Sequence, residues 1–168
     1  MSYDIVIKDG FIFDGTGAPR VRGDVGITEG RVTAVGRVNH RDAGQIIDAS
    51  GMHVAPGFID LHTHYDAQIL WDPYCTLSGW HGITSVAIGN CGFGFAPVAP
   101  EMREYAMRSM VRVEAIPYDS MVQGMPWDWV TFPDYLDSLD RTPKAMNILP
   151  YVPIGPMLLQ VRGVDDAK

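Results

Sequence analysis

Short runs of alternating apolar and polar residues, separated by turn residues, fill the first 56 positions of the chain. In YDIVIKDG, Tyr3, Ile5 and Ile7 share one face of the expected strand, and Val6 lies on the other with the polar residues. Glu29-Gly30 separates two such runs and predicts a two-residue hairpin turn. The runs are YDIVIKDG, FIFD, DVGIT, RVTAVG, IIDASG and MHVAPG. They predict a small, mostly antiparallel β unit over residues 1–56.

The pattern changes after Pro56-Gly57. FIDLH is apolar on both sides of the pleat, as expected of a buried parallel strand, and ITSVAIGN and AMNILPYV are further strands of this kind. Between the last two, apolar residues recur at helical spacing after Pro100, and FPDYLDSLDRT is amphipathic. The stretch PYDSMVQGMPWDW, by contrast, predicts a loop. Alternating strands and helices predict an α/β fold for residues 57–168, as the first units of a parallel sheet or barrel.

Two histidines stand at the end of the first buried strand, in GFIDLHTHYD. Because residues i and i+2 of a strand point to one side, Asp60, His62 and His64 face the same way. Two imidazoles on one rigid strand are oriented for the same metal ion, and the carboxyl end of such a strand is where barrels place their chemistry. The alternative is two histidines that hydrogen-bond only backbone carbonyls. We favour metal binding.

Cys91 follows the next buried strand, in the flexible setting Gly89-Asn90-Cys91-Gly92. A thiolate beside two imidazoles selects Zn²⁺ over Mg²⁺ or Ca²⁺. Taken from the residues alone, two other interpretations of Cys91 stay open: a small buried apolar residue, as most free cysteines are, or a disulfide with Cys75.

The remaining candidates have weaker signals. Asp66 is interpreted as a substrate contact, as a carboxylate that orients a ligand histidine, or as a helix cap. His40, His53 and His81 are interpreted as surface or structural residues. The Met- and Trp-rich stretch 102–129 fits a lid over the site, although ordinary helix packing explains it equally well and is preferred.

Composition narrows the function classes. The chain has 168 residues and a net charge of −7, which argues against nucleic acid or an anionic membrane as its main partner. It has no apolar run long enough to span a bilayer, and its start lacks the basic and apolar regions of a signal peptide. Two cysteines are too few for a disulfide scaffold, so we expect a cytoplasmic protein.

Three stretches, GFIDLHTHYD, HGITSVAIGNCGFGFAPVAP and DIVIKDGFIFDGTGAPR, together with FPDYLDSLDRTPKAMNI, resemble the amidohydrolase superfamily. They are most similar to its N-acyl-D-amino-acid deacylase (D-aminoacylase) branch. That branch uses the cysteine of a Gly-Asn-Cys-Gly stretch as a metal ligand, which the resemblance maps onto Cys91, beside His62 and His64. It also implies a metal-dependent (β/α)₈ barrel from residue 57, preceded by a β-sandwich segment over residues 1–56.

The resemblance implies a zinc-dependent hydrolase of linear amide C–N bonds, with one or two Zn²⁺ ions, that deacylates N-acyl-D-amino acids. Two alternatives remain: hydrolysis of a cyclic amide or another C–N bond, and a non-catalytic assembly module. Two departures from the branch bear on substrate choice, namely Tyr65, where relatives often have Asp, and Ile154, near a position where relatives tend to have His.

A complete barrel takes about 250 residues, and later histidine ligands and the proton-shuttling aspartate of the family have no counterpart before Lys168. We therefore expect the rest of the barrel to come from the same longer polypeptide or from a complementary chain, and the 168 residues alone to be inactive.

Overall fold

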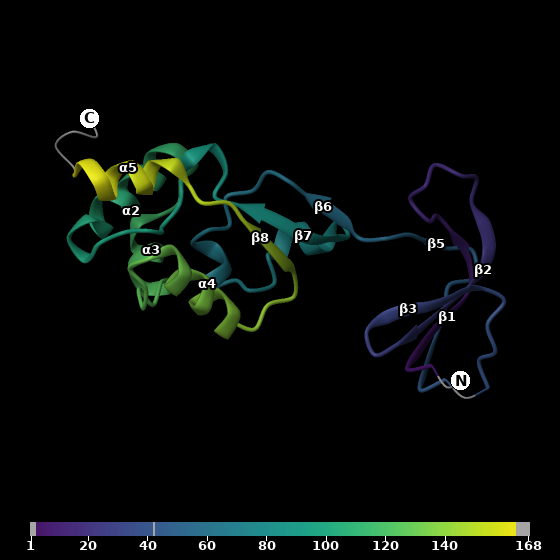
Figure 1. Cartoon of the computed structure of the whole chain (residues 1–168). Helices are drawn as coiled ribbons and strands as arrows, with labels where there is room; N and C mark the ends of the chain where they lie inside the picture. The colour runs from purple at the N-terminus through teal and green to yellow at the C-terminus, as the bar shows by residue number, and fades with distance from the viewer. Residues whose placement is uncertain (1–2, 42, 164–168) are drawn as a thin grey trace. The chain divides into compact units, whose positions relative to one another are not determined.

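The computed structural model describes residues 3–41 and 43–163, and the chain divides at Pro56-Gly57 into two units. In the part of the chain described, the first unit contains strands and turns, whereas the second mixes strands with helices (Figure 1). Among the described residues, no helix combines the length and the apolar character that a membrane crossing requires.

The first unit is one five-stranded sheet. Its main path runs β3-β2-β1-β4, and β5 also pairs with β1. The strands are β1 (Ile5–Ile12), β2 (Val21–Thr28), β3 (Arg31–Gly36), β4 (Gln45–Asp48) and β5 (His53–Val54). The predicted hairpin is confirmed, since Thr28 pairs with Arg31 across Glu29 and Gly30, which both have positive φ.

Two expectations for this unit are corrected. Both β4 and β5 pair with β1 in parallel, so the sheet is mixed rather than mostly antiparallel. The runs YDIVIKDG and FIFD form the single strand β1, in which an irregular register between Ile7 and Gly10 shifts the pairing. The alternation placed Val6 on the same face of the strand as the polar residues. In the structure this face of β1 packs inward, and the Val6 side chain is fully buried.

The second unit contains a three-stranded parallel sheet in the order β6-β7-β8. Its strands are β6 (Phe58–Asp60), β7 (Ile83–Ile88) and β8 (Asn147–Pro150). As the central strand, β7 has neighbours on both edges, and its residues Val86, Ala87 and Ile88 are buried. The expected α/β architecture with parallel strands is therefore present.

The outer strands are more exposed than the apolar pattern predicted. Phe58, Ile59 and Leu61 on and after β6 are 60–66% exposed, and β8 alternates between exposed and half-buried residues. Each of these strands has one sheet neighbour among the described residues, so their apolar side chains lack the cover that a fully enclosed parallel strand has.

The second unit also contains helices, which connect and follow its strands. The α-helices are α1 (Thr76–Trp80), α2 (Arg103–Glu114), α3 (Tyr118–Gly124), α4 (Phe132–Arg141) and α5 (Ile154–Arg162), and short 3-10 helices are η1 (Gln68–Leu70), η2 (Asn90–Gly92) and η3 (Pro100–Met102). The loop expected around residues 117–129 is wrong in part, because α3 forms there. The seven residues of α3, in the segment between Pro117 and Pro126, are too few to show helical periodicity, and the complete burial of Met121 anchors the helix instead.

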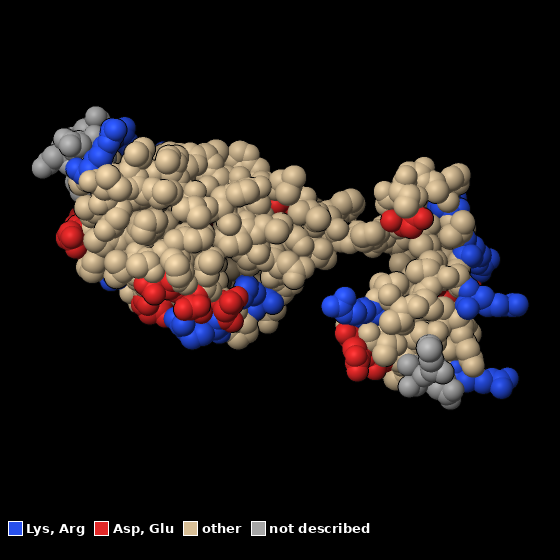
Figure 2. Space-filling model, viewed as in Figure 1, with Lys and Arg blue, Asp and Glu red and all other residues tan. Residues whose placement is uncertain are grey.

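The amphipathic helix predicted from FPDYLDSLDRT is α4. A capping box begins it, with the Thr131 hydroxyl accepting from the Asp134 N–H and the Asp134 carboxylate accepting from the Thr131 N–H. Its apolar face buries Tyr135 and Leu139. Its acidic residues are exposed, and acidic side chains gather on the lower surface of this unit in Figure 2.

The methionines and tryptophans of stretch 102–129 belong largely to the core of this unit. Met107, Met110, Met121 and Trp129 are each at most 6% exposed. The Trp129 indole N–H donates to the Phe95 carbonyl oxygen at 2.7 Å. These four side chains pack in the core, as the preferred interpretation of stretch 102–129 predicted.

Candidate metal centre

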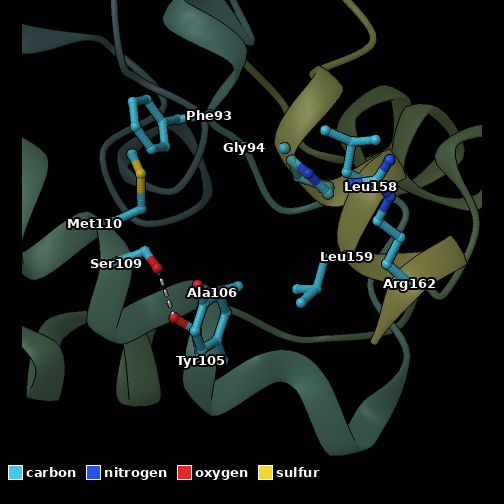
Figure 3. Close-up of a pocket in the computed structure, with 11 residues that line it drawn as sticks. Phe93, Gly94, Tyr105, Ala106, Ser109, Met110, Leu158, Leu159 and Arg162 are labelled. Carbon is cyan, nitrogen blue, oxygen red and sulfur yellow. Dashed lines mark hydrogen bonds between the residues drawn. The ribbon is translucent and has the colours of Figure 1, made fainter. Parts of the chain in front are cut away.

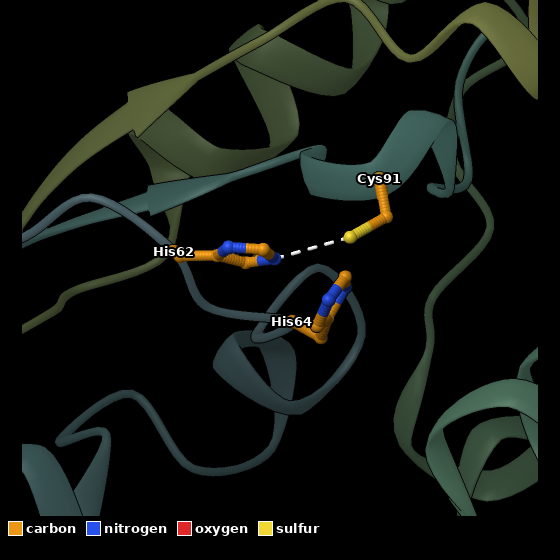
Figure 4. Close-up of side chains that lie close together, drawn as sticks. All are labelled: His62, His64 and Cys91. Carbon is orange, nitrogen blue, oxygen red and sulfur yellow. Dashed lines mark hydrogen bonds between the residues drawn. The ribbon is translucent and has the colours of Figure 1, made fainter.

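Three side chains from two neighbouring strand ends converge on one point (Figure 4). His62 and His64 lie in the loop that follows β6, and Cys91 lies in η2, directly after β7. Because β6 and β7 are parallel, their carboxyl ends meet at the same edge of the sheet. The potential ligand atoms of the three residues all lie within 4.8 Å of one another, and His62 Nε2 is 3.1 Å from Cys91 Sγ.

This donor set fits a zinc ion. Zinc takes imidazole nitrogen at about 2.0–2.1 Å and thiolate sulfur at about 2.3 Å, so donors that share one ion lie close together, as these do. A second observation points the same way: His64 Nδ1 is buried and has no hydrogen-bond partner within the described part of the chain. A buried imidazole nitrogen without a partner is unfavourable unless a ligand satisfies it.

The candidate site opens to solvent. His62 and Cys91 are exposed, and His64 is partly buried. Both histidines line an open cavity of about 340 Å³, together with acidic and polar side chains that include Asp60, Glu114 and Gln68. Both imidazoles can therefore be reached from this cavity.

Hydrogen bonds join the two loops that carry the cluster. The Thr63 hydroxyl donates to the Ala87 carbonyl oxygen at 2.6 Å. The side-chain amide of Asn90 donates to the carbonyl oxygens of Thr63 at 3.1 Å and Ala87 at 3.0 Å. Since Thr63 lies between the two histidines and Asn90 precedes Cys91, these bonds set the spacing between the imidazoles and the thiol. The sequence interpretation had missed this role of Thr63 and Asn90.

The turn that carries Cys91 is tight rather than merely flexible. Cys91 itself has φ +56°, and Gly89 and Gly92 have φ +80°. A Cβ on Gly89 would overlap the carbonyl oxygen of Tyr151, and one on Gly92 would lie 2.7 Å from Ile154 Cγ2. The glycines thus let the backbone segment before α5 pack directly on the turn.

Asp66 does not line the cavity beside the histidines. Its side chain is 2% exposed, and Oδ2 has no hydrogen-bond partner among the described residues. Burial, with a smaller contribution from the charge of Glu114, raises the pKa of Asp66 to about 7 despite the lowering effect of backbone N–H groups. Helix capping is not observed, since η1 has no side-chain cap, and substrate contact through Asp66 stays a prediction.

Glu114 is an acidic neighbour that the sequence interpretation missed. Its Oε1 lies 3.4 Å from His64 Nε2, and the two side chains are 25% and 17% exposed. Glu114 is the last residue of α2, where helices favour basic residues. In the sequence, the one sign of a special role for Glu114 is that an acidic residue stands at the end of a predicted helix.

Other residues singled out in the sequence lie outside the cluster. His53 packs edge-on against Phe11 and Phe13, and His81 follows the last residue of α1 as its C-cap. The Tyr65 hydroxyl shares a hydrogen bond of 2.8 Å with Ser78. The alternative of a Cys75–Cys91 disulfide, which the sequence left open, is wrong, because both cysteines are free.

The two thiols should differ sharply in reactivity. Cys75 is fully buried, and desolvation together with the charge of Asp72 raises the pKa of its thiol to about 11. A buried, protonated thiol reacts slowly with alkylating reagents. The thiol of Cys91 is exposed and therefore accessible to them. We expect iodoacetamide to alkylate Cys91 in the metal-free native protein and Cys75 only after denaturation, as peptide mass spectrometry would show. Equal labelling of both under native conditions would contradict this arrangement.

A second cavity, of about 310 Å³, lies between α2 and α5 (Figure 3). Its lining is mostly apolar, with Tyr105, Ser109 and Arg162 as polar members. None of the three clustered residues lines it.

The chain is similar in sequence and in structure to known proteins. Residues 45–150 match the model of the amidohydrolase family. The chain is 36% identical over 165 residues to N-acyl-D-aspartate deacylase of Alcaligenes xylosoxydans xylosoxydans, covering 97% of this chain and 30% of that protein.

Two solved structures are similar over nearly the whole chain. The N-acyl-D-glutamate deacylase of Bordetella bronchiseptica, in complex with zinc and a phosphonate mimic of the tetrahedral intermediate, has a TM-score of 0.77 and 32% identity, covering 95% of this chain and 31% of that one. A D-aminoacylase studied for its binuclear metal centre has a TM-score of 0.74 and 33% identity, covering 92% of this chain and 30% of that one. The chain therefore spans about three tenths of the length of these proteins.

Proposed function

Because this chain belongs to the amidohydrolase family, we propose that the protein containing it is a zinc-dependent hydrolase of linear amide C–N bonds that deacylates N-acyl-D-amino acids. The observation that carries the proposal is the convergence of His62, His64 and Cys91 within 4.8 Å at the carboxyl ends of two parallel strands. The relatives compared above, which match nearly the whole chain, are deacylases of this kind, and one of them is in complex with zinc. They support the same substrate class.

In this proposal, His62, His64 and Cys91 hold one or two zinc ions. Bound zinc would lower the pKa of a water molecule and polarise the amide carbonyl. The chain's own residues prepare the site: Thr63 and Asn90 set the distance between the two ligand loops, and the open cavity admits the substrate. An aspartate beyond Lys168 would pass the proton to the leaving amine.

We further infer that residues 57–168 are the first units of a (β/α)₈ barrel and that residues 1–56 are a β-sandwich segment. Three parallel strands in sequential order, with helices between them, fit the start of such a barrel. The exposed Phe58, Ile59 and Leu61 fit a strand that is covered once a barrel closes. The rest of the barrel would come from the same polypeptide or a complementary chain.

The test uses the full-length protein. We expect purified protein to contain zinc and to release acetate from an N-acetyl-D-amino acid, but not from its L enantiomer. Removing the metal with a chelator should lower turnover by several orders of magnitude, and added Zn²⁺ should restore it, because zinc supplies the ionised water and the polarised carbonyl.

The control outcomes separate the alternatives. Zinc-dependent turnover of a cyclic amide, with neither acetylated enantiomer cleaved, would keep the hydrolase and reject the D-amino-acid substrate. Absence of bound zinc and of any hydrolysis would favour a non-catalytic assembly module.

A further inference from the structure

We propose that Glu114 is a positioning residue that holds the imidazole of His64 in the orientation in which it binds metal. The inference rests on the proposed metal site and adds to it a residue from α2, which is distant in sequence from the histidine loop. A histidine that binds metal through one ring nitrogen usually donates its other N–H to a carboxylate or carbonyl, which fixes the ring and its tautomer.

The two side chains lie within ion-pair distance of each other. His64 Nε2 lies 3.4 Å from Glu114 Oε1, while the other ring nitrogen, Nδ1, is buried without a hydrogen-bond partner in the described part of the chain. One nitrogen therefore faces a carboxylate and the other is left for a ligand. Both side chains are shielded, at 17% and 25% exposure, so solvent screens the interaction less than it would on the surface.

The other carboxylates beside the histidines are engaged differently. Asp60 Oδ1 accepts a hydrogen bond from the backbone N–H of His62 at 3.1 Å. Asp66, which the sequence suggested for this role, is buried and contacts neither imidazole by a hydrogen bond within the described residues. Glu114 is thus the carboxylate that faces an imidazole ring nitrogen of the cluster.

The placement of Glu114 also makes it a rigid support. Its helix, α2, buries Ala106, Met107 and Met110 in the core, and the Arg103 side chain donates to the Trp129 carbonyl oxygen at 2.9 Å. An acid in the last turn opposes the helix dipole and so lowers the stability of α2. Among the described residues, its one ion-pair partner within 4.0 Å is His64, which is the interaction that offsets this cost.

The test compares variants of the full-length protein by their affinity for Zn²⁺ and Co²⁺, measured by competition with a chromophoric chelator. We expect Glu114→Ala to weaken metal binding about 10- to 100-fold, the range found when such outer partners are removed. Glu114→Gln, whose amide oxygen still accepts a hydrogen bond, should lose less than Glu114→Ala. Glu104→Ala, on the exposed face of the same helix, is the matched control and should bind as the parent does.

Melting of the metal-free proteins separates positioning from structure. A merely structural Glu114 would change the melting temperature without changing the affinity of the folded protein, and that result would overturn the inference. If Glu114→Ala does not fold, Glu114→Asp replaces it, since its shorter side chain draws the carboxylate away from His64. A parent protein that binds no zinc would instead reject the metal site itself and, with it, the proposed function.

Discussion

The Cys91→Ser variant of the full-length protein is expected to lose most of its zinc and to deacylate N-acetyl-D-amino acids several orders of magnitude more slowly. Serine has nearly the volume of cysteine, but its hydroxyl ionises far less readily and is a poor ligand for a borderline-soft ion. Without the metal, neither the acidified water nor the polarised carbonyl is available. Zinc per chain and turnover, measured together, check both parts of this expectation.

Cys75→Ala provides the matched control for this variant. It removes the other thiol of the chain, which is fully buried in the core and outside the cluster. We expect it to lower thermal stability while zinc content and turnover per folded molecule stay at the parental level. Full zinc occupancy in Cys91→Ser would reject Cys91 as an essential ligand.

The second large effect is expected for Gly89→Ala, which alters the turn beside Cys91. Gly89 has φ +80°, and a Cβ there would overlap the carbonyl oxygen of Tyr151, a backbone atom that side-chain rotation does not move. We expect a loss of about 2–4 kcal/mol in the free energy of unfolding, from left-handed strain and overpacking together. The displaced turn should also lower turnover by about 100-fold, because small shifts of reacting groups have effects of this size.

Gly82→Ala is its control at the other end of the same strand. Gly82 has nearly the same φ, +78°, but its added Cβ would lie 3.7 Å from Phe58, an ordinary contact. Gly82→Ala should therefore lose only the cost of left-handed strain, about 1–2 kcal/mol in the free energy of unfolding, and its zinc content should be unchanged. Equal losses in the two variants, by chemical denaturation and zinc analysis, would show that the contact with Tyr151 is not what requires glycine at position 89.

Several features of the fold follow from local sequence. Glu29-Gly30 predicts its hairpin because a two-residue turn of this kind needs positive φ at both positions, which Gly adopts freely. The amphipathic helix α4 follows from apolar periodicity and from the Thr131 and Asp134 side chains that cap its start. The clustering of His62, His64 and Cys91 was anticipated because parallel strands bring their carboxyl ends to one edge.

Features that depend on packing could not be predicted in this way. Which face of β1 packs inward, with Val6 rather than Ile5 and Ile7 fully buried, depends on what covers the sheet. Helix α3 forms because Met121 is buried in the core, although its short segment between two prolines has the composition of a loop.

For the candidate site, the sequence by itself determined the donor types and their place at strand ends, because strand alternation and residue chemistry are local properties. Only the tertiary structure decided what surrounds them. It brought Glu114 of α2 to within 3.4 Å of His64, buried Asp66, and joined the two ligand loops through Asn90. The contacts of Glu114 with His64 and of Asn90 with Thr63 link residues 50 and 27 positions apart. Such pairings are selected by the packing of the whole unit, which no local pattern encodes.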